Sequence, residues 1–214
     1  MKESSISDWN TIWKKQQKSW LFVTIGRRFY NFFFLSLLRR YLIPDTYFIE
    51  LGCGTGSLGF LLAPELGKYV GIDNSQVAIE QAQKRLQESK NGNVMFICSD
   101  LLVLNTLERF DVVWSQGLLE HFEDEKPVLI AHLSLLRTGG VALMSVPMKY
   151  SIFYWWYIIS RGGVLWPWGE QKFYFRSDLD RLIRSVGKIC KWEIESNWLL
   201  GLHIIKISLP LCSD

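Results

Sequence analysis

Three glycines at alternate positions, Gly52, Gly54 and Gly56, follow a short apolar segment and precede a segment of helical character. Glycine at a strand-to-helix turn lets the backbone turn tightly and approach a ligand closely, because no Cβ is in the way. A turn with a purely structural role is the simpler interpretation. The stretch Gly54–Gly59 also satisfies the dinucleotide-binding pattern G-x-G-x-x-G, with Asp73 at about the expected distance. The glycines alone therefore leave the ligand open.

Carboxylates around this turn narrow the choice. Glu50 ends the segment before it, where a carboxylate would face a pyrophosphate poorly but suits an ammonium or sulfonium group. Asp73 ends the next predicted strand, and its two oxygens can accept hydrogen bonds from both hydroxyls of a ribose. Asp100 ends a third predicted strand and can accept from an adenine amino group, with Leu101 packed on the ring. This set favours a cationic ligand that carries an adenosine.

A second segment with chemical potential, Gln116–Phe122, follows the fourth predicted strand. His121 within it has an ordinary pKa near neutrality and can serve as a general base for an acceptor hydroxyl. It can instead bind a metal ion, or form hydrogen bonds within the fold and shape the pocket. His132 and His203 have no comparable surroundings and are interpreted as surface or packing residues.

The elements that would position these residues alternate between strands and helices. Strands are predicted at 47–51, 69–73, 94–98, 111–115 and 141–146, and helices at 6–20, 27–42, 58–63, 76–89, 125–137 and 177–186. Ser75 and Ser177 are predicted N-caps, and Thr138–Gly140 is predicted to close the helix before it. Two final strands, 189–196 and 203–209, are predicted to form a hairpin. The sequence predicts an α/β fold with a parallel sheet, covered on both faces, that ends in an antiparallel hairpin.

Several stretches taken together resemble the successive motifs of class I S-adenosylmethionine-dependent methyltransferases, in particular the type 11 group that includes the ubiquinone-biosynthesis O-methyltransferases. The stretches are Glu50–Gly56, Asp73, Ser99–Asp100, Phe110–Ser115 and Leu136–Gly140, and the resemblance covers about residues 45–196. It implies a Rossmann-like three-layer sandwich with a seven-stranded, mostly parallel sheet. It also implies methyl transfer from S-adenosyl-L-methionine, with S-adenosyl-L-homocysteine as the product.

The resemblance assigns residues of the glycine turn and of the strand ends to the cofactor: Glu50, Gly52, Cys53, Gly54, Gly56, Asp73, Asn74, Asp100, Leu101 and Gln116. Gly52 and Gly54 are expected at the methionine part, with Gln116 on the same side. The ribose is expected at Asp73 and Asn74, and the adenine at Asp100 and Leu101.

Some members of the group resemble the pattern E-x-x-E-H after the fourth strand and bind a divalent metal ion there. In this chain Gly117 stands at the first glutamate position, whereas Glu120 and His121 remain. One ligand is therefore missing, and no metal site is predicted. The roles of base and of pocket residue stay open for His121.

Methyl transfer from a sulfonium is an in-line displacement that needs mainly alignment of the reactants and exclusion of water. Specificity is therefore expected from an N-terminal helical cap at 1–44 and from an insertion at 148–175 within the methyltransferase domain 45–214. Both are rich in aromatic residues: Trp9, Trp13, Trp20, Phe29, Tyr30, Tyr150, Phe153, Tyr154, Trp155, Trp156, Tyr157, Trp166 and Trp168. They are expected to form a packed lid, an apolar acceptor pocket or a membrane-interface surface.

Composition limits the class of partner. A formal net charge of +3 over 214 residues gives no nucleic-acid footprint, so a small apolar or aromatic acceptor is predicted, such as a lipid, quinone precursor or natural product.

Four cysteines without a C-x-x-C pair indicate reduced thiols. The apolar runs are shorter than the roughly 20 residues of a membrane span. We expect a cytoplasmic enzyme with peripheral membrane contact; the alternatives are a cofactor-binding or membrane-docking subunit without catalysis and a nicotinamide-dependent oxidoreductase.

Overall fold

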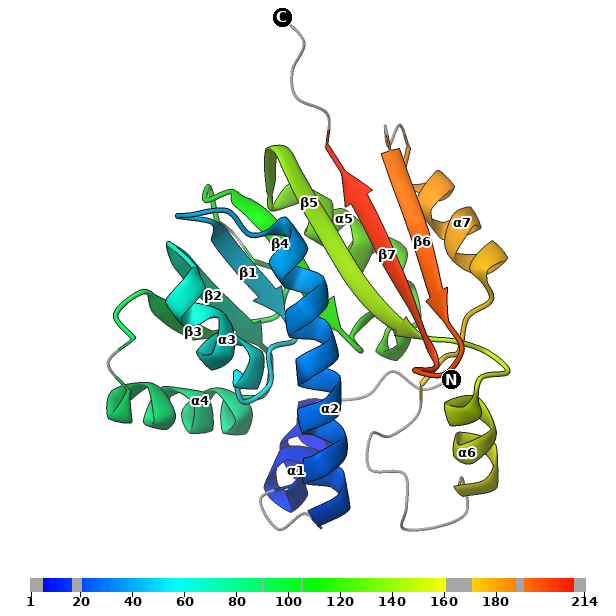
Figure 1. Ribbon diagram of the computed structural model, residues 1–214, viewed down its shortest axis with the longest axis horizontal. Coiled ribbons are helices and arrows are strands. Elements are labelled where there is room, and N and C mark those ends of the chain that lie inside the picture. The colour runs from blue at the N-terminus through cyan, green and yellow to red at the C-terminus, as the bar shows by residue number, and fades with distance from the viewer. Residues whose placement is uncertain are drawn as a thin grey trace, which may run out of the picture. The chain divides into compact units, whose positions relative to one another are not determined.

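A computed structural model of the chain describes residues 6–16, 21–89, 91–104, 106–160, 171–187 and 191–209 (Figure 1). The α-helices are α1 (Ile6–Gln16), α2 (Leu21–Leu38), α3 (Ser57–Leu62), α4 (Gln76–Glu88), α5 (Lys126–Ser134), α6 (Ile152–Ser160) and α7 (Arg176–Ser185). The strands are β1 (Tyr47–Leu51), β2 (Lys68–Asp73), β3 (Val94–Cys98), β4 (Phe110–Gln116), β5 (Leu136–Pro147), β6 (Lys191–Asn197) and β7 (Leu202–Ser208). Short 3₁₀ helices lie at η1 (Arg39–Tyr41), η2 (Ala63–Glu65) and η3 (Leu119–His121). Of the aromatic residues named above, Trp20, Trp166 and Trp168 lie outside the described residues.

The strands form one sheet in the order β3-β2-β1-β4-β5-β7-β6, flanked by helices. β1 pairs with β2, and β2 with β3, in parallel. β4 pairs with β5 in parallel, whereas β7 runs antiparallel to both β5 and β6. The predicted fold class, a mostly parallel sheet that ends in an antiparallel hairpin, is confirmed.

The chain divides into two compact units. The N-terminal unit holds helices α1 to α4 and strands β1 to β3, and the C-terminal unit holds α5 to α7 and β4 to β7. No helix among the described residues is both long and apolar enough to cross a membrane.

Aromatic rings connect the three strands of the N-terminal unit. Phe48 of β1 stacks on Tyr69 of β2 with 5.8 Å between ring centroids, and Tyr69 meets Phe96 of β3 edge-on at 5.8 Å. All three side chains are buried. Ring pairs of this kind contribute about 0.5–1.5 kcal/mol beyond their burial, so they stabilise the strands from which the predicted cofactor residues follow.

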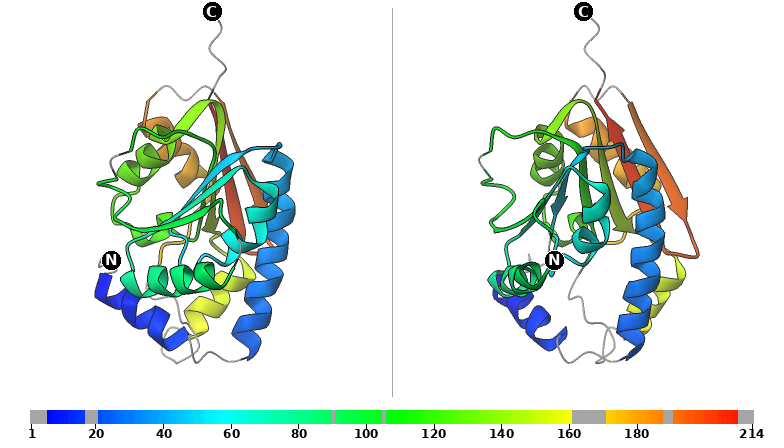
Figure 2. Two further views of the ribbon diagram at one scale, coloured as in Figure 1. Left: turned by 90° about the vertical axis from the view of Figure 1, so that its left-hand side faces the viewer. Right: turned by 60° about the vertical axis from the view of Figure 1, so that its left-hand side comes forward.

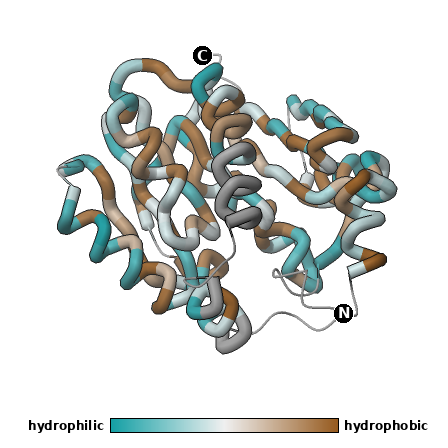
Figure 3. The backbone as a smooth tube through the Cα atoms, turned by 60° about the horizontal axis from the view of Figure 1, so that its bottom comes forward, coloured by the Kyte–Doolittle hydropathy of each residue, from teal (hydrophilic) through white to brown (hydrophobic). Residues whose placement is uncertain are grey.

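Helix α4 follows β2 and begins as predicted. Ser75 is its N-cap, and the Ser75 hydroxyl accepts a hydrogen bond from the Ala78 N–H at 3.3 Å. The buried residues Ala78, Ile79 and Ala82 recur at helical spacing, and most of the remaining helix is hydrophilic (Figure 3). The N-cap fixes the chain direction directly after Asp73, because only Asn74 separates that residue from Ser75.

The predicted helix over 125–137 is wrong at its C-terminal end. Helix α5 ends at Ser134, and Leu136 already pairs with Phe110 as the first residue of β5. Gly140 lies within this strand, and a Cβ there would lie 3.0 Å from the carbonyl oxygens of Phe110 and Asp111. Gly140 therefore allows a close approach between β4 and β5 instead of closing a helix.

Other helix boundaries also differ from the prediction. Ser177 is not an N-cap, because α7 begins one residue earlier and the Phe175 N–H donates to the Asp178 carboxylate at 3.0 Å. Helix α2 begins at Leu21, six residues before the predicted start, and α1 is described only as far as Gln16. The aromatic insertion contains helix α6, which the sequence analysis left without structure.

Candidate functional site

The glycine turn after β1 is built on backbone hydrogen bonds. The N–H groups of Gly52 and Cys53 both donate to the carbonyl oxygen of Ile72 on β2, at 2.8 and 2.9 Å. Gly52, Gly54 and Gly56 have φ angles of 73°, 53° and 67°. These angles lie in the left-handed region that side chains with a Cβ rarely adopt, so the alternate glycines are required by the backbone itself. The predicted tight turn is present.

Asp73 at the end of β2 is held by the turn on one side and by α4 on the other. Its Oδ2 accepts from the Gly54 N–H and its Oδ1 from the Ser75 N–H, both at 2.8 Å. Burial raises the pKa of Asp73, and the two N–H donors oppose that rise. A carboxylate oxygen can accept two hydrogen bonds, so each oxygen keeps one acceptor position. The carboxylate is therefore fixed in orientation and can still receive two hydroxyl groups.

Glu50 is buried near the end of β1. The residue is 4% exposed, and its Oε2 accepts a hydrogen bond from the Tyr69 hydroxyl. Burial raises the pKa of Glu50 to about 8, the Tyr69 bond opposes the rise, and the nearby charge of Asp73 adds to it. Burial also raises the pKa of the Cys53 thiol. At neutral pH Glu50 mainly holds its proton, and a cation placed beside it would favour the ionised form.

The end of β3 lies beside the end of β2, because the Ser99 N–H donates to the Asp73 carbonyl oxygen at 3.0 Å. Asp100 is exposed and accepts from the Leu102 N–H at 2.9 Å, while Asn74 and Leu101 are half-buried. The N-terminal unit thus brings together the glycine turn and the polar ends of β2 and β3, as predicted for parallel strands.

Gln116 and His121 belong to the C-terminal unit. Gln116 ends β4 opposite Ser145, and the Gly117 N–H donates to the Ser145 carbonyl oxygen at 3.1 Å. The 3₁₀ helix η3 then places His121, which is 8% exposed. Among the described residues no group of three or more His, Cys, Asp and Glu side chains could hold a metal ion.

Glu120 carries a buried carboxyl group, although the sequence indicated only that it occupies one position of the metal-binding pattern E-x-x-E-H. It is 3% exposed, burial raises its pKa to about 8, and Oε2 has no hydrogen-bond partner within the described part of the chain. Oε1 lies close to Gly117, since a Cβ there would lie 3.3 Å from it. Only the three-dimensional structure shows this burial.

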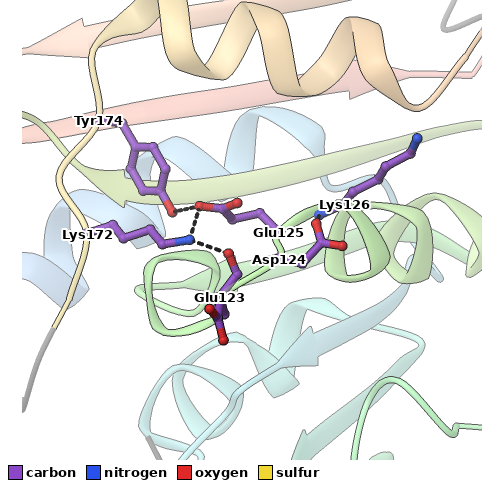
Figure 4. Close-up of polar contacts among 6 residues, drawn as sticks. All are labelled: Glu123, Asp124, Glu125, Lys126, Lys172 and Tyr174. Carbon is purple, nitrogen blue, oxygen red and sulfur yellow. Dashed lines mark hydrogen bonds and ion pairs between the residues drawn. The ribbon is translucent and has the colours of Figure 1, made fainter. Parts of the chain in front are cut away.

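A polar network fixes the chain after η3 to the segment that follows residue 170 (Figure 4). The Lys172 ammonium group donates to Glu125 Oε1 at 2.6 Å and to the Glu123 carbonyl oxygen at 2.7 Å. The Tyr174 hydroxyl also donates to Glu125, at 3.1 Å, and the Lys172 N–H donates to the Glu120 carbonyl oxygen at 3.1 Å. These bonds join the segment after residue 170 to Glu120, Glu123 and Glu125.

The remaining two histidines are packing residues. His132 is buried, its Nδ1 lies 2.8 Å from the Val128 carbonyl oxygen, and its Nε2 lies 2.8 Å from the Ser115 hydroxyl. Because a carbonyl only accepts, Nδ1 carries the proton, and Nε2 accepts from Ser115. Burial lowers the pKa of His132 to about 4. His203 is buried as well, with Nδ1 2.8 Å from the Ser196 hydroxyl.

Comparison with known proteins identifies the class. A family model described as a methyltransferase domain matches residues 44–161, more than half of the chain, and the chain therefore belongs to this methyltransferase family. It is 30% identical over 104 residues to a ubiquinone biosynthesis O-methyltransferase of Coxiella burnetii, a match that covers 48% of this chain and 44% of that protein. It is 28% identical over 116 residues to phosphoethanolamine N-methyltransferase 2 of Caenorhabditis elegans, covering 52% and 26%. The chain thus spans less than half the length of these two relatives.

The fold agrees with this family. The magnesium protoporphyrin IX methyltransferase of Synechocystis PCC 6803, solved with bound S-adenosylhomocysteine, superposes with a TM-score of 0.66 at 20% identity over 86% of this chain and 84% of that one. The protein has the class I, Rossmann-like methyltransferase fold, in agreement with its membership of the methyltransferase family. Family membership decides against the nicotinamide-dependent alternative.

The N-terminal unit fits the cofactor S-adenosyl-L-methionine. The glycine turn leaves backbone without Cβ atoms, and Asp73 keeps two acceptor positions of the kind that a ribose diol needs. When bound, the cofactor supplies an electrophilic methyl group on a sulfonium, for which the protein must provide orientation and a dry site.

Proposed function

We propose that the protein transfers the methyl group of S-adenosyl-L-methionine to a small, apolar or aromatic acceptor by in-line displacement. The main support for the cofactor site is the pair of hydrogen bonds that the Asp73 carboxylate accepts from the Gly54 and Ser75 N–H groups. Through these two bonds, one carboxylate links the glycine turn to the start of α4. The proposed cofactor residues are those of the turn and the strand ends: Glu50, Gly52, Cys53, Gly54, Gly56, Asp73, Asn74, Asp100, Leu101 and Gln116.

The proposed acceptor residues follow β4. Glu120 has a buried carboxyl oxygen without a partner among the described residues, and such a group costs about 1–3 kcal/mol until a ligand satisfies it. An acceptor hydroxyl or amine would do so. His121 beside it is the proposed general base for a hydroxyl acceptor.

Two observations support the proposed acceptor class. The names of the two relatives above refer to small molecules, one to ubiquinone biosynthesis and one to phosphoethanolamine, which supports a small acceptor without deciding its polarity. In this chain, Phe173 packs against Tyr154 and Tyr157 of α6, with 5.2 and 5.0 Å between ring centroids. Aromatic rings therefore lie directly beside Lys172, which supports an apolar or aromatic acceptor.

An acceptor screen tests the proposal. The protein is incubated with methyl-labelled cofactor and, separately, a lipid extract, a set of phenols and amines, RNA and protein. We expect label in small molecules that partition into organic solvent, and with a hydroxyl acceptor we expect His121→Gln to lower the rate by about 100-fold or more. Label in RNA or protein alone would contradict the proposal. Cofactor binding without transfer to any acceptor would favour the alternative of a non-catalytic subunit.

A surface around α6 supports a second proposal, that the enzyme is cytoplasmic and rests against an anionic membrane. We name as the α6 patch the exposed large apolar residues there: Tyr150, Ile152, Trp155, Trp156, Ile158, Ile159, Phe175, Trp198 and Leu199. Trp198 donates from its indole N–H to the Tyr150 carbonyl oxygen at 3.1 Å, and the Tyr150 ring stacks on Trp155 at 6.0 Å, so these three residues of the patch lie side by side. The Lys149 ammonium group lies beside it, 4.8 Å from the centre of the Phe175 ring. Trp and Tyr beside a cation suit a lipid interface.

Vesicle flotation checks this second proposal. We expect the protein to float with vesicles that contain phosphatidylglycerol, and expect Trp155→Ser combined with Ile159→Ser to reduce the bound fraction at least fivefold. Leu107→Ser is the control, because Leu107 is 93% exposed but lies outside the patch. Equal flotation of the double variant would refute the proposal, as would a dimer that buries the patch in the absence of lipid.

A further inference from the structure

Helix α1 lies across the glycine turn. The indole ring of Trp13 rests on Gly54, since a Cβ at that glycine would lie 2.5 Å from Cη2 and Cζ2 of the ring. Trp13 is half-buried, and Figure 2 shows α1 beside α4 in both views. Trp13 of α1 therefore contacts Gly54, the glycine proposed to lie at the methionine part of the cofactor.

A second contact joins α1 to the start of α4. The Ser75 hydroxyl donates to Asn10 Oδ1 at 2.7 Å, while the same oxygen caps α4 by accepting from Ala78. Asn10 and Trp13 are three residues apart, so both project from one side of the helix. The helix is thus attached at two points on one face.

Both contacts end on residues that hold the same carboxylate. Trp13 contacts Gly54, whose N–H donates to Asp73 Oδ2, and Asn10 bonds to Ser75, whose N–H donates to Asp73 Oδ1. A ligand that contacts Gly54 or the remaining acceptor positions of Asp73 would therefore lie near α1. An indole face attracts cations and excludes water, which suits a sulfonium ligand.

We propose that Asn10 and Trp13 belong to the cofactor site and that α1 is its cover, which must detach for the cofactor to enter and leave. This inference rests on the cofactor site of the proposed function and adds to it two residues that precede the family match at 44–161. Its consequence is kinetic, because a cover that closes on the ligand slows dissociation more than association.

The test measures the binding of S-adenosylhomocysteine to the full chain by rapid mixing and calorimetry. We expect Trp13→Ala to raise the dissociation rate about tenfold or more, and Asn10→Ala to raise it less. Lys14→Ala is the matched control, because Lys14 is exposed on the same helix, and its rate should not change. In the unaltered protein, saturating ligand should slow hydrogen exchange at the amides of residues 6–16.

An unchanged or slower dissociation from a folded Trp13→Ala protein would overturn the inference, because the indole would then be outside the site or would obstruct it. Unchanged exchange at residues 6–16 would overturn it as well, and this measurement needs no variant. If Asp73→Ala weakens binding while Trp13→Ala does not, the cofactor site stands and only the cover is wrong. If Asp73→Ala has no effect, the cofactor site itself is misplaced.

Discussion

Replacing Asp73 by alanine is expected to weaken S-adenosylhomocysteine binding by about 1–3 kcal/mol, the loss typical of hydrogen bonds to a charged group. Two effects act in the same direction. The ribose hydroxyls lose the acceptor positions that remain on the carboxylate oxygens. The N–H groups of Gly54 and Ser75 also lose the acceptor that holds the glycine turn against the start of α4.

Titration calorimetry measures this loss directly, and circular dichroism verifies that the variant is folded. Glu88→Ala is the control, because Glu88 is an exposed carboxylate at the far end of α4 and should leave the affinity unchanged. A folded Asp73→Ala protein with unaltered affinity would show that the ribose assignment is wrong.

The Glu50→Gln variant is expected to be more stable than the parent protein, by a margin that grows as the pH rises. In the unfolded chain the Glu50 carboxyl titrates near its ordinary value of 4.5, whereas burial raises its pKa to about 8 in the folded protein. Between these values the unfolded chain loses the proton and the folded chain keeps it, so the contribution of Glu50 to stability falls as the pH rises. Glutamine does not titrate, and the free energy of unfolding of the variant should exceed that of the parent by a margin on the order of 3 kcal/mol by pH 8.

The same variant should bind the cofactor more weakly, because the neutral amide cannot supply a negative charge to a cationic ligand. Urea denaturation at pH 5, 6, 7 and 8 gives the stability margin, and calorimetry with S-adenosylmethionine gives the affinity. Glu80→Gln serves as the comparison, since Glu80 is exposed on α4. A stability margin that does not change with pH would mean that Glu50 is not neutral in the folded protein.

The sequence predicted those features that depend on residues close together in the chain. The glycine turn was predictable because three left-handed residues in five positions require glycine. The Ser75 N-cap was predictable because its bond reaches only three residues along the chain. The end of α5 was not, since a Gly-Gly pair after a helix is also compatible with the close approach of β4 and β5 that the structure contains.

The contacts that complete the site join distant parts of the sequence. Asn10 and Ser75 are 65 positions apart, and nothing in the sequence around Trp13 distinguishes it from the other tryptophans of the N-terminal segment. Glu120 likewise looks like an ordinary acidic residue until the fold shows that it is buried. Such residues become visible only when tertiary packing is known.

A crystal structure of the full chain with S-adenosylhomocysteine would locate the cofactor relative to Asp73 and the glycine turn. We predict the ribose hydroxyls on the Asp73 carboxylate, the adenine beside Asp100 and Leu101, and the homocysteine part along Gly52 and Gly54. A ligand bound away from Asp73 and the glycine turn would contradict this prediction.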